Sequence, residues 1–203
     1  MTATVDDISE ENAGEYDFST PEELLEKFRQ GDSGAFRALL AQCGVPLFGF
    51  LYHYLGDYGL AADAYRRTWA KIARADDFDA RESLRFWLFA TARNTALDIV
   101  AAAPEAPALA AAQEIAAALR RHLDANFNIE DFGRRLTQAV TALPLAQRDV
   151  FLLREDADLT FREIGAILGC PPANAQKHLA DALDTLLTAV QTDARLTRLL
   201  SRL

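Results

Sequence analysis

The most regular pattern in the first half of the chain is an apolar side chain at every third or fourth position. This spacing places the side chains on one stripe of a helix, and the positions are Phe36, Leu39, Leu40, Cys43, Leu47, Phe50, Leu51 and Tyr54. Asp32 or Ser33 is suited to cap the start, and Gly56 with Asp57 ends the pattern. Pro46 lies inside it and predicts a kink. The sequence therefore predicts one long amphipathic helix.

Three more helices are predicted before residue 100. Thr20, Pro21 and Glu23 form a capping box with a proline in the first turn, which starts the first of them. The next is expected over about 60–75, with an inward face of Ala61, Ala64, Tyr65, Thr68, Trp69 and Ile72. A loop at 76–80 and a helix over about 81–100 follow. Four helices of this kind predict one compact domain.

The second half has the same helical character after an interruption. Residues 101–113 are rich in Ala and contain Pro104 and Pro107, which is typical of a linker. A helix is expected to resume over about 108–123. Farther on, Thr160 and Glu163 form another capping box, and Gly169 marks a helix end. The last helix is expected to bury Ala175, Leu179, Ala182, Leu183, Leu186, Leu187 and Val190.

These elements predict an all-α protein with two helical domains joined by a linker, the C-terminal one containing a helix-turn-helix. The expected divisions are 1–19, 20–100, 101–133 and 134–203. Residues 1–19 carry six acidic side chains and neither Lys nor Arg. This composition favours a disordered acidic arm, with an electrostatic mimic of nucleic acid as the alternative. The linker is 101–133.

Charge and composition narrow the class of protein. The net charge of −9 argues against indiscriminate binding to nucleic acid, although a local basic face is compatible with it. Cys43 and Cys170 fit no metal spacing and are expected to be buried free thiols, as in a cytoplasmic protein. His53 and His122 are isolated and are expected to have no role. The sequence predicts no metal, no cofactor, no signal peptide and no membrane insertion.

An enzyme is not expected. The sequence has no Gly-rich phosphate loop and no nucleophile beside a base motif. The function is therefore sought in binding.

Two separated segments resemble the bacterial sigma factors of the extracytoplasmic-function group, which direct RNA polymerase to promoters. The first contains GDSGAF at 31–36, PLFGF at 46–50, LGD at 55–57, ADAYRRTW within 61–69 and FWLFATARNTALD at 86–98. It is similar to the region of the family that binds the polymerase clamp and melts the minus-ten element. The second, residues 143–187, resembles the helix-turn-helix region that binds the minus-35 element. The resemblance implies core polymerase (its beta-prime clamp and beta flap) and promoter DNA as partners.

For the first segment, the resemblance implies that one helix and the loop before it hold the unpaired minus-ten strand. Cations that follow the backbone and aromatic rings that accept splayed bases suit this task. The candidate residues are Arg81, Arg85, Phe86, Trp87, Arg93 and Asn94. The alternative is that Trp87 and Leu88 are core and the arginines are a solvated face.

For the helix-turn-helix, the resemblance implies that the second helix reads DNA. The candidate contacts are Thr160, Arg162, Asn174, Lys177 and His178. A simple helix cap is the alternative for Thr160, and a solvated face is the alternative for the others. Between residues 136 and 190 there are four basic and seven acidic residues, a net charge of −3. That balance is unusual for a domain that grips DNA.

The polymerase-facing helix also departs from the family. The resemblance implies polymerase contacts at Asp63, Arg66, Arg67 and Trp69. The family usually has Gln and Glu where this chain has Arg66 and Arg67, so the sign of the charge is reversed toward a partly basic clamp. Such a reversal at an interface can cost several kcal/mol.

Two functions follow from these observations. The first is a working sigma factor that binds core polymerase and specifies promoters. The alternative is a degenerate sigma-like protein that has lost promoter reading and acts as a binding module for an anti-sigma factor or another regulator. Fold analogy alone does not choose between them.

Overall fold

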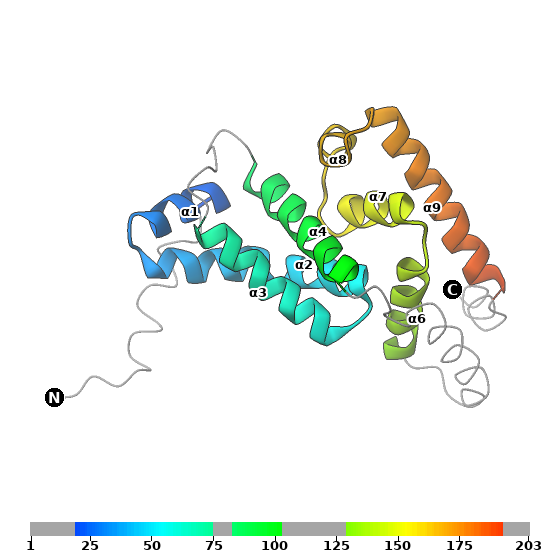
Figure 1. The fold of residues 1–203 in the computed structure, drawn as a ribbon, viewed down its shortest axis with the longest axis horizontal. Coiled ribbons are helices and arrows are strands. Elements are labelled where there is room, and N and C mark those ends of the chain that lie inside the picture. The colour runs from blue at the N-terminus through cyan, green and yellow to red at the C-terminus, as the bar shows by residue number, and fades with distance from the viewer. Residues whose placement is uncertain (1–18, 75–82, 103–128, 193–203) are drawn as a thin grey trace.

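The computed structural model describes residues 19–74, 83–102 and 129–192, and every regular element in those ranges is a helix (Figure 1). The prediction of an all-α protein is confirmed. The helices are α1 (Pro21–Arg29), α2 (Ser33–Leu55), α3 (Tyr58–Arg74), α4 (Leu84–Ala102), α6 (Ile129–Thr141), α7 (Leu145–Glu155), α8 (Phe161–Leu168) and α9 (Pro172–Thr192).

The first four helices pack around α2. Helix α2 contacts α1, α3 and α4, and its buried side chains include Leu39, Leu47 and Phe50. The Thr20 capping box of α1 forms as predicted, and Asp32, not Ser33, caps α2. Apolar burial along a predicted stripe therefore accounts for the core of this domain.

Helix α2 is one long helix, as the apolar stripe predicts, and Pro46 lies inside it. Its length and a mean hydropathy of 1.4 over its most apolar window would suit a membrane span. The sequence predicted no membrane insertion, whereas by length and composition alone this helix is a candidate span. Core helices of soluble proteins pass the same test, and α2 packs against α1, α3, α4, α6 and α7.

The second helical unit consists of α6, α7, α8 and α9, with α9 in contact with the other three. The Thr160 capping box starts α8, and Gly169 ends it with a left-handed backbone at φ +65°, as the sequence predicts. Leu183 and Leu187 of α9 are about half exposed (50% and 52%), so their predicted burial was wrong. The buried face of α9 is the narrower stripe that contains Ala175, Ala182 and Leu186.

Some predicted segments fall wholly or partly outside the described residues. These are the acidic arm before residue 19, the loop at 76–80 and the helix at 108–123. Helix α4 ends at Ala102 and α6 begins at Ile129, so helices enter both ends of the expected 101–133 linker.

Candidate nucleic-acid interface

The two helical units contact each other directly, with α2 against α6 and α7 and α4 bonded to α7. At the centre of this contact lies Asp149 of α7, which is only 2% exposed. Its Oδ1 accepts a hydrogen bond of 2.7 Å from the Tyr54 hydroxyl, and its Oδ2 lies 2.6 Å from Nη2 of Arg93. A buried carboxylate therefore holds one side chain from α2 and one from α4. We call this group the Asp149 cluster.

Arg148 strengthens the same contact. Its Nη1 donates to the backbone oxygen of Tyr54 at 3.1 Å, and its guanidinium lies 5.2 Å from the centre of the Tyr54 ring. Burial, and then the charge and hydrogen bond of Asp149, raise the pKa of Tyr54. Burial opposes the charged form of Arg93, but the hydrogen bond and charge of Asp149 outweigh it and raise the Arg93 pKa. The cluster therefore holds a neutral phenol and a charged guanidinium.

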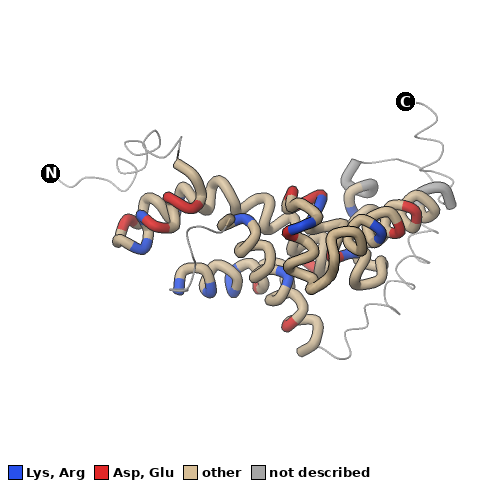
Figure 2. Tube along the Cα trace, turned by 90° about the horizontal axis from the view of Figure 1, so that it is seen from above, with Lys and Arg blue, Asp and Glu red and all other residues tan. Residues whose placement is uncertain are grey.

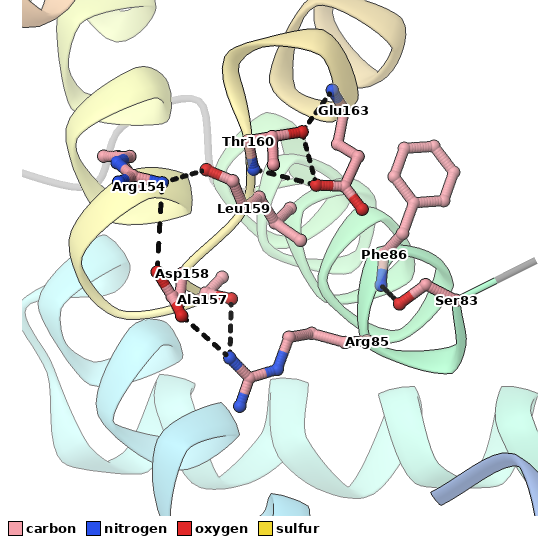
Figure 3. Close-up of polar contacts among 9 residues, drawn as sticks. All are labelled: Ser83, Arg85, Phe86, Arg154, Ala157, Asp158, Leu159, Thr160 and Glu163. Atoms are coloured by element: carbon pink, nitrogen blue, oxygen red, sulfur yellow. Dashed lines mark hydrogen bonds and ion pairs between the residues drawn. The ribbon is translucent and has the colours of Figure 1, made fainter.

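A second contact is made by Arg85 at the start of α4. Its Nη1 donates to the backbone oxygen of Ala157 at 3.3 Å and lies 3.9 Å from Asp158 (Figure 3). The same Asp158 carboxylate lies 3.8 Å from Arg154, and Asp158 has a positive φ of 50°. The side chains of Arg85 and Asp158 are half exposed or more, so this ion pair contributes little to stability.

A third contact joins His53, at the end of α2, to Asp156, the residue that follows α7. His53 Nδ1 lies 2.8 Å from Asp156 Oδ2, and Thr141 of α6 donates to the backbone oxygen of His53. The hydrogen bond that His53 donates to Asp156 raises the pKa of His53, and partial burial opposes it. The expectation that His53 has no role was wrong, because this side chain joins the two units.

The His53 contact should make the association of the two units depend on pH. A raised pKa in the closed arrangement means that the contact contributes fully below the ordinary value of 6.5 and is lost as the pH rises above it. Small-angle X-ray scattering should therefore show a larger radius of gyration above neutral pH than at pH 6. The His53→Gln variant keeps the other histidines, including His178, and should nevertheless lose this pH dependence. An identical pH curve for that variant would remove His53 from the explanation.

Two of the minus-ten candidates form hydrogen bonds with groups of the second helical unit. Arg93, only 15% exposed at its side chain, bonds Asp149, and Arg85 bonds the α7–α8 turn. Trp87 is partly buried against the core and Leu88 is fully buried, as the core alternative predicts. Phe86 is also partly buried against the core, whereas Asn94 is exposed. Arg81 lies outside the described residues. A DNA strand could reach Arg93 only if the Asp149 cluster opened.

The helix-turn-helix candidates remain accessible. Arg162, Asn174 and Lys177 are exposed and His178 is half-buried. The Thr160 hydroxyl lies 2.6 Å from Glu163 Oε2 and accepts from the Glu163 backbone N–H (Figure 3). Thr160 thus performs the capping role that was its alternative interpretation, and its contact with DNA stays a prediction.

The polymerase candidates on α3 divide into two kinds. Trp69 is 6% exposed and packs edge-on against Phe36 and Tyr65, so it belongs to the core and cannot contact a partner from this position. Arg66 and Arg67 are exposed, and Arg67 pairs with Asp63 at 2.7 Å. The arginines that depart from the family pattern are therefore presented on the surface.

Sequence reasoning did not identify Tyr54, Arg148 and Asp149 as a connected group, nor Asp156 as the partner of His53. The one local signal was an Arg-Asp pair immediately before the apolar residues 150–153, because a charge beside a buried stripe needs a partner. Cys43 and Cys170 are free thiols but only partly buried. In the described ranges no three His, Cys, Asp or Glu side chains form a group that could hold a metal ion.

Comparison with known proteins matches both helical units to one family. Residues 39–103 match Sigma-70 region 2, and residues 133–186 match Sigma-70 region 4. The chain belongs to the sigma-70 family. The two matches lie in the expected order, and together they cover more than half of this sigma factor.

Curated relatives place this sigma factor in the extracytoplasmic-function group. It is 27% identical over 168 residues to the probable RNA polymerase sigma-C factor of Mycobacterium bovis, covering 81% of this chain and 88% of the relative. It is 24% identical over 182 residues to the ECF RNA polymerase sigma-E factor of Escherichia coli K12, covering 85% and 95%.

Two solved structures share the fold of this sigma factor. CnrH in complex with the cytosolic domain of CnrY matches with a TM-score of 0.64 and 20% identity, covering 86% of this chain and 99% of that one. The sigma factor RpoE in complex with the anti-sigma factor NepR from Bartonella quintana matches with a TM-score of 0.55 and 18% identity, covering 78% and 98%.

Proposed function

We propose that this sigma factor binds core RNA polymerase and directs promoter-specific initiation, and that its free form is closed by the Asp149 cluster. The observation that carries the function is the ordered match to both Sigma-70 regions. The protein acts by binding and not by catalysis, and we infer that it works in the cytoplasm, where polymerase and promoter DNA are found.

In the proposed division of labour, α4 binds the unpaired minus-ten strand and α9 binds the minus-35 element. Arg85, Arg93 and Asn94 supply cationic and polar groups on α4, and phosphate contacts of this kind contribute much of the affinity for DNA. In the closed form, the guanidinium of Arg93 is paired with the carboxylate of Asp149 and is not available to a phosphate. Opening must therefore accompany promoter binding.

The face of α9 is open in the same arrangement, so its role can be tested separately. Replacing Lys177 with Glu should weaken promoter binding and reduce the slope of log affinity against log salt by about one or more. Fluorescence anisotropy with duplex promoter DNA over a range of salt concentrations measures both quantities. The same substitution at Lys27 of α1 is the matched control. An unchanged slope for Lys177→Glu would remove this residue from the interface.

The whole function is tested by run-off transcription with purified core polymerase over a promoter library. Promoter-specific transcripts are the expected result.

The competing function is a sigma-like module that binds a regulator such as an anti-sigma factor. It is favoured by Arg66, Arg67 and the acidic pair Asp181 and Asp184 on α9. Failure to bind polymerase, together with tight binding of such a partner, would replace the first function by the second.

A further inference from the structure

The exposed side of α3 carries four cations along its second half. Arg66, Arg67 and Lys71 have side-chain exposures of 72%, 58% and 50%, and Arg74 at the helix end is exposed as well. Figure 2 shows blue Lys and Arg positions in a row along the tube at one edge of the molecule. We call these four residues the α3 basic face.

The α3 basic face borders a surface hollow of about 520 Å³ between α3 and α4. Arg67, Lys71 and Arg74 line it together with Ala70, Thr95 and Asp98. Lys71 Nζ donates to Thr95 Oγ1 at 3.0 Å and lies 3.6 Å from Asp98. The hollow is open, and three of its six lining residues are cations, so it can accept carboxylate side chains.

Two carboxylates lie among the four cations of the α3 basic face, and they limit which anionic ligands can bind there. Asp63 pairs with Arg66 and Arg67, and Asp98 lies beside Lys71. Four cations less two carboxylates leave a net charge of +2. A nucleic-acid backbone has a phosphate at every nucleotide and would be repelled by both carboxylates. A peptide with spaced acidic residues can avoid them, so an acidic peptide fits this surface better than DNA or RNA does.

The chain itself contains such a peptide. Residues 1–18 have six carboxylates and neither Lys nor Arg, and they lead directly into Ser19, whose backbone oxygen accepts a hydrogen bond from Gln42 of α2. Eighteen residues can extend to about 60 Å, which is more than the 17-residue length of α3, about 26 Å at the helical rise. A tethered segment also has an effective concentration on the order of millimolar.

We propose that the acidic segment at residues 1–18 binds the α3 basic face of the same chain. Its carboxylates pair with Arg66, Arg67, Lys71 and Arg74, and binding changes the net charge of this surface from +2 to −4, since the segment contributes six negative charges. The surface then has the sign that the family pattern leads one to expect at Arg66 and Arg67. The binding itself does not depend on polymerase or promoter DNA.

A zero-length carbodiimide crosslink, which joins a carboxylate to a lysine amine, tests the proposal. The chain has only three lysines, at 27, 71 and 177, so peptide mapping of the monomer band assigns every product. Residues 1–18 should crosslink to Lys71 far more than to Lys177, which is exposed on α9. The Lys71→Arg variant, which keeps the charge, should lose that product, and high salt should suppress it because the attraction is screened.

A matched variant separates specific binding from chance encounters. Replacing Asp6, Asp7, Glu10 and Glu11 by their amides should reduce crosslinking of Lys71 by the remaining residues Glu15 and Asp17. Equal yields at Lys71 and Lys177, or a Lys71 yield unaffected by salt, would overturn the proposal. So would a Lys71 product found only in dimers, which would assign the segment to a second copy. None of these results bears on transcription, so the proposed function would stand or fall separately.

Discussion

Replacing Asp149 with Asn should open the two helical units and raise the affinity for a single-stranded minus-ten oligonucleotide about tenfold or more. Asn keeps an acceptor for Tyr54 but leaves the Arg93 cation, 15% exposed, opposite a neutral amide. Breaking a buried ion pair on one side costs about 3–5 kcal/mol. Part of this cost in free energy destabilises only the closed form, because solvent or a DNA phosphate can bind Arg93 when the two units separate.

Fluorescence anisotropy with a labelled oligonucleotide measures the affinity, and circular dichroism checks that the variant is folded. Glu155→Gln is the matched control because it removes one acidic charge from an exposed position of the same helix. Tyr54→Phe removes only the hydroxyl that donates a hydrogen bond to Asp149, so it should increase the affinity for the oligonucleotide by less. A folded Asp149→Asn variant with unchanged affinity would show that the cluster does not restrict α4.

The second large effect is expected at the polymerase surface. Changing Arg66 to Gln and Arg67 to Glu together should strengthen binding to core polymerase by about tenfold or more, because charge complementarity at an interface is worth several kcal/mol. The lost pair between Arg67 and Asp63 is exposed and has little value of its own. Restoring the family pair therefore adds a favourable contact with little loss of stability.

Biolayer interferometry with immobilised core polymerase measures this affinity. Arg74→Gln is the appropriate control, since it removes a cation from the same helix outside the Gln-Glu position. A gain confined to the double variant supports direct contact of Arg66 and Arg67 with the clamp. Weaker binding by the double variant would mean that its polymerase contact uses these arginines and differs from the family pattern.

The helices of the protein could be predicted because their signals are local. The Thr20 and Thr160 capping boxes depend on residues three positions apart, and the left-handed Gly169 cap depends on one residue. Trp69 shows the limit of such local signals, because the sequence predicted both an inward position, which its burial confirms, and a polymerase contact. A large aromatic side chain on an amphipathic helix can be a core residue or a docking residue, and only its contacts with Phe36 and Tyr65 decide between them.

The contact between the two units could not be predicted in this way. Asp149 lies 95 residues from Tyr54 and 56 from Arg93 in the sequence, so no periodicity connects them. Arg93 was identified as a DNA-binding candidate because a cation on an exposed helix face suits phosphate. The same property allows Arg93 to bind a carboxylate of the second unit. The sequence does not show whether Arg93 binds a phosphate or a carboxylate.

Closure of the two units and binding of the minus-ten strand should exclude each other. The most direct test is the distance between spin labels at Val45 of α2, which is 82% exposed, and Ala180 of α9, also exposed, with Cys43 and Cys170 replaced by Ala. Pulsed electron resonance should give one short distance for the free protein and a longer one with saturating single-stranded oligonucleotide. An unchanged distance in the presence of fully bound oligonucleotide would contradict the account.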